Sequence, residues 1–347
     1  MNPWLTNNYP KHKERCSLSP SVILAGLRLL EARGADMALL QLRWGFPLAA
    51  LRQPHLRLPA FLARRFWEAA RGLCDEPALG LAAAKPADLG QLLGLSYLMQ
   101  LMPNRLEALQ VMQRYWPLVA GHIAFHFEQQ ADVLRISLQT PARLRPAEEE
   151  VDYWYARQIQ HLRGWVCAPE PLREVRLRRP RPADPSPWER QANRPVRFSA
   201  ERDELVLDLA ALQFERPAGP ASVRQALEEA LDDYARQTAE GSLLELASSA
   251  VLQELGSGLN LDDLAKRLHM TPRTLHRSLL RDGWSFSDLL DIHRRYLAHD
   301  LLQDGVLPIA EIADQLGYGE VSSFTRAIRR WYGTTPGALR DFASPHG

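Results

Sequence analysis

The sequence predicts two domains of different fold class. The first is an α+β N-terminal domain of helices plus a small antiparallel sheet, and the second is an all-α C-terminal domain. Three observations support this prediction: the 347 residues exceed what one core usually accommodates, the hydrophobic period changes from that of helices to that of strands, and the chain after Pro217–Pro220 has only helical patterns.

The composition is typical of an ordinary soluble globular protein, with 46% hydrophobic and 24% charged residues and a net charge of +1. No run of about 18 apolar residues occurs, and the polar start of the chain lacks the layout of a signal peptide. We therefore expect a cytoplasmic protein without a membrane segment. The cysteines lie far apart, at Cys16, Cys74 and Cys167, so we expect no disulfide framework, no metal site and no cofactor.

The N-terminal domain is expected at residues 19–215, after a flexible tail at residues 1–18. Its first part has the leucine- and alanine-rich pattern of helices, broken by Gly and Pro. Residues 122–127 and 133–138 then alternate apolar and polar side chains and predict a β-hairpin. The remaining elements are a helix and three strands, expected at residues 148–166, 174–177, 196–198 and 204–209.

Two groups of side chains in this domain admit both a functional and a structural interpretation. His122 and His126 would share one face of a strand, but a metal would need a third ligand that the sequence does not offer. Tyr153, Trp154 and Tyr155 would either line a ligand pocket or pack in the core. The structural interpretation is favoured for both groups, and no ligand-binding residue is assigned.

A linker is expected at residues 216–241, and the C-terminal domain at residues 242–347. Within the linker, residues 221–237 have the pattern of a helix whose exposed side is acidic: Glu228, Glu229, Asp232 and Asp233.

The first motif of the C-terminal domain lies at about residues 261–282. Thr271 is a good N-cap, and Pro272 follows at the first helical position, where no N–H donor is needed. In the next helix Leu275 and Leu279 face inward, and the opposite face carries arginines spaced by four: Arg273, Arg277 and Arg281. Two short helices across a tight turn, the second with a basic face, are the layout of a helix-turn-helix motif.

The same layout recurs at about residues 308–332. Pro308 begins a short helix, Gly317–Gly319 forms the turn, and the next helix has one polar face: Ser322, Arg326, Arg329 and Arg330. A helix at residues 286–302, capped by Ser285, joins the motifs and is about 25 Å long. The sequence thus predicts two helix-turn-helix motifs joined by a long helix, a spacing that suits successive major-groove segments about 34 Å apart.

The charges of residues 242–347 are segregated. As a whole this segment is slightly acidic, with 11 Lys and Arg against 13 Asp and Glu. Residues 266–281 nevertheless hold five basic residues and residues 321–340 hold four, with no acid in either. A positive field confined to the second helix of each motif suits phosphate contact, so we expect modest affinity for random DNA and strong dependence on base contacts.

The residues of both motifs resemble those of the AraC/XylS family of transcription regulators over about residues 242–342. The matching segments are DLAKRLHMTPRTLHR from Asp263, GWSF from Gly283, IAEIA from Ile309, LGY from Leu316, SSFTR from Ser322 and WYGTTP from Trp331. This resemblance implies that the exposed face of each second helix contacts bases. On this sequence those positions are Arg273, Thr274 and Arg277, and Val321, Ser322 and Arg326.

Four further residues complete the expected DNA interface. His276 and Ser323 would either contact DNA or lie at the rim of the interface, and Arg329 and Arg330 would contact phosphates. Val321 stands where many relatives carry a polar side chain, and it could contact a thymine methyl group instead. The preceding residue, Glu320, would either accept a hydrogen bond from cytosine or cap the helix.

Segments of the N-terminal domain resemble the arabinose-binding-like domain that accompanies amino-acid-responsive and quorum-related regulators of this family. The segments are 106–115, 195–198 and 205–208, together with the hairpin between them. The resemblance implies effector sensing, dimerisation or both, and it does not imply a sugar. The expected protein is a transcription activator whose partners are double-stranded DNA, a second copy of the chain, RNA polymerase and a small-molecule effector such as an amino acid or small acid.

Two alternatives stay open at this point. A constitutive dimeric DNA binder would use the N-terminal domain only for dimerisation, whereas a buried, partly polar cavity there would favour effector control. A DNA-targeted alkyl-transfer enzyme would need a reactive thiolate, and none of the three cysteines has an activating motif nearby. No nucleophile elbow or phosphate loop is present either, so we expect no enzyme.

Overall fold

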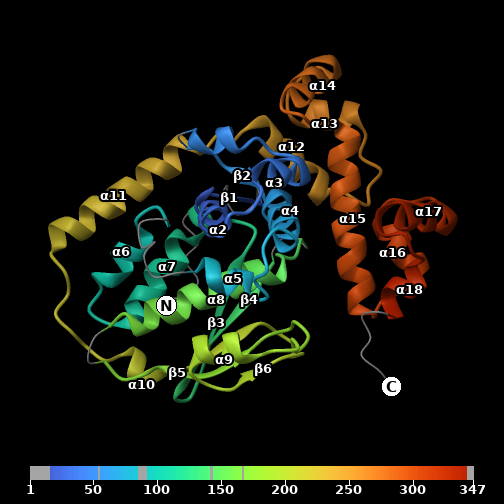
Figure 1. Cartoon of the computed structure of the whole chain (residues 1–347). Helices are drawn as coiled ribbons and strands as arrows, with labels where there is room; N and C mark the ends of the chain where they lie inside the picture. Colours follow the sequence, from blue (N-terminus) through green and yellow to red (C-terminus); the bar gives the residue numbers. More distant parts are fainter. Residues whose placement is uncertain (1–15, 54, 85–91, 141–143, 166–167, 342–347) are drawn as a thin grey trace. The chain divides into compact units, whose positions relative to one another are not determined.

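The computed structural model describes residues 16–53, 55–84, 92–140, 144–165 and 168–341 (Figure 1). The chain folds into two compact units, one of residues 1–141 and 146–240 and one of residues 142–145 and 241–347. The helix expected in the linker, α11 (Ala221–Gln237), falls in the first unit. The sequence-based boundary at residues 216–241 stays a prediction.

Helices make up most of the first unit. Besides α11 and a 3-10 helix at Leu48–Arg52, the described helices are α2 (Ser21–Ala32), α3 (Met37–Trp44), α4 (Ala60–Arg71), α5 (Leu79–Ala83), α6 (Leu95–Gln100), α7 (Arg105–Val119), α8 (Glu148–Arg163), α9 (Ser186–Ala192) and α10 (Leu209–Leu212).

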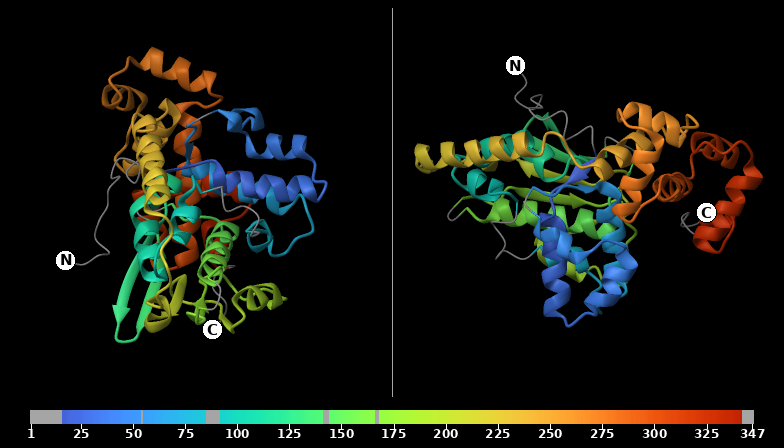
Figure 2. Two further views of the ribbon diagram at one scale, coloured as in Figure 1. Left: turned by 90° about the vertical axis from the view of Figure 1, so that its left-hand side faces the viewer. Right: turned by 90° about the horizontal axis from the view of Figure 1, so that it is seen from above.

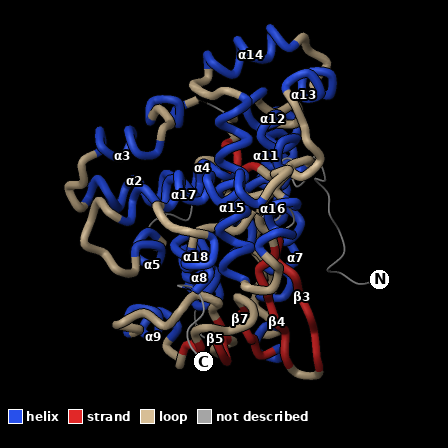
Figure 3. Tube along the Cα trace, turned by 90° about the vertical axis from the view of Figure 1, so that its right-hand side faces the viewer, coloured by secondary structure: helices blue, strands red, loops and turns tan. Residues whose placement is uncertain are grey.

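A five-stranded sheet confirms the predicted α+β class of this unit. In spatial order its strands are β3 (Ala124–Gln130), β4 (Val133–Gln139), β7 (Glu204–Asp208), β5 (Leu172–Arg176) and β6 (Val196–Arg197). The strands gather in one layer (Figure 3), and the β3–β4 hairpin extends past the helices in the left view of Figure 2. The pairs are antiparallel except β5–β6, which is parallel because α9 carries the chain back between these two strands.

The expected tail is wrong at its end. Ser17–Leu18 forms strand β1, which pairs with β2 (Leu58–Pro59), and both strands are buried. The buried Arg57 holds this pair in place: its Nε donates to Ser17 Oγ (2.9 Å) and its Nη2 donates to the carbonyl oxygen of Ser17 (3.1 Å). Residues 1–15 lie outside the described residues.

Helix α8 lies in the core of the first unit, and its aromatic residues are core residues. Tyr153 and Trp154 are fully buried, and the ring of Trp154 packs at 4.5 Å from the ring of Trp116. The two histidines do not share a strand face: His122 precedes β3 and is buried, with Nε2 3.0 Å from Glu150 Oε1, whereas His126 on β3 is exposed. Among the described residues no cluster of His, Cys, Asp or Glu suits a metal ion.

The second unit is all-α, as predicted. Its helices are α12 (Leu243–Gln253), α13 (Leu261–Arg267), α14 (Pro272–Arg281), α15 (Phe286–Asp304), α16 (Ile309–Gln315), α17 (Val321–Tyr332) and α18 (Pro336–Asp341). Helix α14 lies beyond the N-terminal end of α15, and α16 to α18 lie beside α15 (Figure 1). Across both units, no described helix combines the length and apolar character needed to cross a membrane.

Candidate nucleic-acid interface

The first helix pair consists of α13 and α14. Its turn is closed by the backbone N–H of Met270, which donates to the carbonyl oxygen of Ala265 (2.8 Å). Thr271 caps α14 as predicted, because its Oγ1 accepts from the N–H of Thr274 (3.2 Å). Leu275 and Leu279 are fully buried, and their burial fixes which face of α14 points outward.

The outward face of α14 carries the predicted residues. Arg273, Thr274, His276 and Arg277 are all exposed. The hydroxyl of Thr274 is hydrogen-bonded to that of Thr271 (2.8 Å), so it forms part of the cap. Other cations of this segment have acidic neighbours: Arg267 pairs with Glu254, the residue that follows α12, and Lys266 Nζ lies 3.7 Å from Asp263. The positive field is therefore concentrated on Arg273 and Arg277.

The second helix pair, α16 and α17, repeats this geometry. The backbone N–H of Tyr318 donates to the carbonyl oxygen of Ala313 (2.9 Å), as Met270 does to Ala265 in the first pair. Both turns pass through the left-handed region, at Gly317 with φ 72° and at His269 with φ 54°. Phe324 and Ile328 anchor α17 with fully buried side chains.

The outward face of α17 is also exposed, at Val321, Ser322, Arg326 and Arg329, with Ser323 half-buried. Ser322 Oγ donates to Glu320 Oε2 (2.9 Å), and Arg326 Nη2 donates to Ser323 Oγ (3.0 Å). Glu320 occupies the N-cap position, but its side chain makes no capping hydrogen bond. Of the two roles expected for Glu320, the cap is therefore wrong.

Helix α15 holds the second pair through Arg294 and Asp291, whose roles were not predicted from the sequence. Arg294 donates from Nε to the carbonyl oxygen of Leu316 (2.7 Å) and from Nη2 to that of Gly317 (3.0 Å). Asp291, one turn earlier, pairs with Arg330 and accepts from Trp331 Nε1 (2.8 Å). The signal in the sequence was the spacing of Asp291 and Arg294, which stand three residues apart and therefore share one face of the spacer helix.

Opposite the second pair, α15 packs on α12. Ser248 Oγ on α12 lies 2.9 Å from His293 Nε2. His293 is 1% exposed, and this burial lowers the pKa of its imidazole to about 3. The spacer helix is thus fixed on α12 by a neutral histidine.

The first unit contains a small internal cavity between α8, α9 and the sheet. Asp152, Tyr155 and Gln191 supply its polar lining. Burial raises the pKa of the Asp152 carboxyl to about 7, although Arg179 pairs with it and Trp188 Nε1 donates to it (2.9 Å). The cavity measures about 20 Å³, room for one water molecule, so it does not hold an amino acid as it stands.

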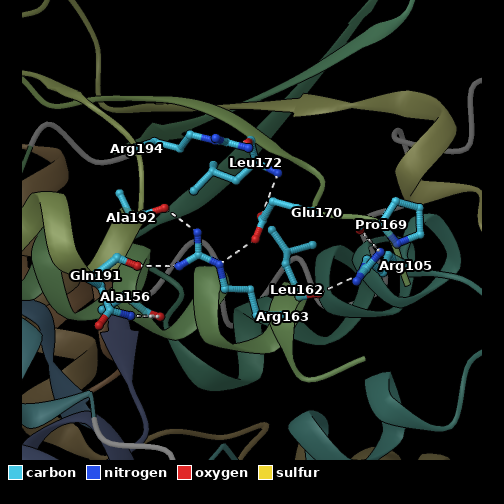
Figure 4. Close-up of polar contacts among 10 residues, drawn as sticks. All are labelled: Arg105, Ala156, Leu162, Arg163, Pro169, Glu170, Leu172, Gln191, Ala192 and Arg194. Atoms are coloured by element: carbon cyan, nitrogen blue, oxygen red, sulfur yellow. Dashed lines mark hydrogen bonds and ion pairs between the residues drawn. The ribbon is translucent and has the colours of Figure 1, made fainter. Parts of the chain in front are cut away.

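One wall of this cavity is α9, which polar contacts tie to α8 (Figure 4). Arg163 donates to the carbonyl oxygens of Gln191 (2.6 Å) and Ala192, and its Nε lies 2.8 Å from Glu170 Oε2. Gln191 Nε2 also donates to the carbonyl oxygen of Ala156 (3.4 Å). Movement of α9 away from α8 would break these contacts.

Two family models match the chain. The N-terminal arabinose-binding domain of AraC transcription regulators matches residues 34–215, and a helix-turn-helix domain matches residues 264–341. The chain is therefore a DNA-binding transcription regulator. It belongs to the AraC family of transcription regulators, as the sequence resemblance predicted.

The chain is also similar to individual transcription regulators. The chain is 27% identical to the ornithine utilization regulator of Pseudomonas aeruginosa over 300 residues, 84% of this chain and 86% of that protein. It is 36% identical to the urease operon transcriptional activator of Escherichia coli over 90 residues, 26% of this chain and 30% of that protein. It is also similar to the crystal structure of the regulator CdpR from Pseudomonas aeruginosa, with TM-score 0.41, 22% identity, and 88% and 97% of the two chains covered.

Proposed function

We propose that the two helix pairs are two DNA-reading heads, each placing its second helix in a major groove. The observation that carries the proposal is the segregation of side chains on α14 and α17, where the anchoring apolar residues are buried and the arginines are exposed. Arg273, Arg277 and Arg326 are the principal readers, and Arg329 contacts phosphate. Further contacts come from Thr274, His276, Val321, Ser322 and Ser323, and Arg330 lies near the end of α17. At about 1.5 Å per residue α15 measures about 28 Å, which suits grooves about 34 Å apart.

We further propose that the protein is a cytoplasmic homodimer that activates transcription with RNA polymerase in response to an amino acid or small acid. The match to an arabinose-binding domain supports a ligand-responsive first unit. Of the relatives, one is named for ornithine utilization and one is named an activator. A DNA-targeted alkyl-transfer enzyme is disfavoured, because burial raises the pKa of the Cys16 thiol to about 12 and also raises that of Cys74.

A DNA-shift assay on the region upstream of the protein's own gene tests the DNA-reading role. Arg277→Ala combined with Arg326→Ala should abolish the specific shift, because each bidentate base contact contributes about 1–3 kcal/mol. The matched control removes two exposed arginines of the first unit, Arg202→Ala with Arg236→Ala, and should leave the shift intact. A native protein that gives no shift, or unchanged binding by the double variant, would refute the proposal.

A further inference from the structure

A groove between α15 and α17 contains the contacts that fix the second reading helix. Asp291 and Arg294 line it from α15, and Arg326 and Arg330 line it from α17. Asp291 is the only acidic residue among the described residues that line the groove. All of these contacts are made within the chain, so they are present in the protein without DNA.

Asp291 binds α17 through both carboxylate oxygens. Oδ1 pairs with Nη2 of Arg330, and Oδ2 accepts a hydrogen bond from Nε1 of Trp331 (2.8 Å). Two donors that are adjacent on α17 thus meet one acceptor group on α15. Such a two-point attachment restricts rotation of α17 about its own axis, and this rotation decides where Arg326 and Ser322 point.

Arg294 fixes the other end of the same helix pair. Its guanidinium donates to the carbonyl oxygens of Leu316 and Gly317 and lies 4.7 Å from the centre of the Tyr318 ring. Asp291 and Arg294 stand three residues apart and therefore share one face of α15. From that face, the spacer holds the turn before α17 and the last turn of α17 at once.

The pairing also changes what Arg330 can do. Arg330 is expected from the sequence to contact phosphate, but its guanidinium pairs with Asp291, although its side chain is 63% exposed. Arg329, its neighbour, is exposed to solvent. Of the two arginines, Arg329 is therefore the phosphate contact and Arg330 is a positioning residue.

We propose that Asp291 is a specificity-determining positioning residue, which sets the orientation of α17 without touching DNA. This inference rests on the proposed DNA-reading role of α17. Specific binding needs the correct geometry of the reading helix, whereas binding to random DNA depends mainly on charge. Loss of the Asp291 contacts should therefore weaken specific binding without weakening binding to random DNA.

The test compares wild type and Asp291→Ala on two probes, the upstream DNA of the gene and a random-sequence duplex of equal length. Affinity for the upstream DNA should fall about fivefold or more, the low end of what one base contact contributes. Affinity for the random duplex should hold or rise, because a negative charge is removed near the phosphates. Asp314→Asn on α16 is the matched control for charge: it also removes an exposed carboxylate and should not lower affinity for the upstream DNA.

Other outcomes overturn the inference. An equal rise on both probes would mean that Asp291 acts only through its charge. A fall of affinity on both probes would mean that Asp291→Ala is poorly folded. Asp291→Asn, which keeps an acceptor for Trp331, is then tested on the same two probes, and the inference requires its affinity to fall on the upstream DNA alone. If Arg326→Ala lowers binding to the upstream DNA and neither Asp291 variant does, the inference alone fails. If Arg326→Ala has no effect either, the proposed function fails with it.

Discussion

At the residue scale, His293 shows how a buried polar group makes stability depend on pH. The imidazole lies between α15 and α12 beside Ser248 Oγ, and its pKa of about 3 means that it is neutral in the folded protein. In the unfolded chain a histidine has a pKa of about 6.5. Between about pH 6.5 and pH 3, His293 therefore binds a proton in the unfolded chain but not in the folded protein.

The folded pKa is depressed, so the contribution of His293 is fully present above about pH 6.5 and is lost as the pH falls toward 3. Acidification from about pH 6.5 to about pH 5 should cost about 2 kcal/mol for this residue. We expect urea unfolding of His293→Gln to lack this loss, since glutamine keeps a hydrogen-bonding group but does not titrate. His161 in the first unit also has a pKa of about 3, so the comparison has to be between variant and wild type. Identical pH profiles would disprove the assignment.

The sequence could not predict the role of a residue whose partner lies far away along the chain. Asp291 and Arg330 are 39 positions apart, and Arg57 reaches the carbonyl oxygens of Pro117 and Leu118 from 60 and 61 positions away. No periodicity or spacing rule connects such residues, because the fold alone brings them together. The exposed faces of α14 and α17, in contrast, were predictable, because local helical spacing decides which residues share a face.

At the element scale, the two helix pairs use the same turn with different residues. The first turn has His269 at φ 54° and the second has Gly317 at φ 72°. A left-handed conformation costs an L-residue roughly 1–2 kcal/mol, whereas glycine adopts it freely. The first turn therefore carries strain that the second avoids.

We expect His269→Gly to stabilise the second unit by about 0.5–1 kcal/mol, the relief of strain less the entropy that glycine loses on folding. The reciprocal change, Gly317→Ala, should destabilise it by at least about 1 kcal/mol. A Cβ at that position would also lie 3.0 Å from the carbonyl oxygen of Leu255. Thermal unfolding of both variants measures this, and a destabilised His269→Gly would show that the histidine side chain has a role of its own.

Elements with strong local signals were predictable, and very short ones were not. Helix α11 has the predicted bounds, and the caps at Thr271 and Ser285 form as their residue types require. The two-residue strands β1 and β2 are too short to show a period. Helix α9 lies in a proline-rich segment where its own Pro187 is compatible only with the first helical turn. Its presence also made β6 parallel to β5, which a pattern of strands could not reveal.

At the scale of the whole molecule, each unit matches its own family model: the first an arabinose-binding domain and the second a helix-turn-helix domain. Residues 242–347 are slightly acidic, yet the exposed faces of α14 and α17 are basic, because acids sit on the first helix of each pair and on α15. The sequence could predict this segregation from spacing alone. It could not predict the internal cavity of the first unit, because this cavity depends on the packing of α8, α9 and the sheet, which come together only in the fold.

Effector control predicts that a small ligand stabilises the first unit of the intact chain. A thermal-shift screen of amino acids and small acids should find a compound that raises the unfolding temperature by several degrees, since a ligand at a hundred times its Kd adds about 2.7 kcal/mol. The Arg277→Ala, Arg326→Ala variant is the control, because it should lose DNA binding and keep the full shift. A screen without any shift, together with DNA binding that no compound changes, would instead favour a constitutive DNA binder. If the compound enters the internal cavity, which is too small for it as it stands, then α9 as one of its walls is expected to move, and hydrogen exchange of residues 186–192 would detect this as altered protection on binding.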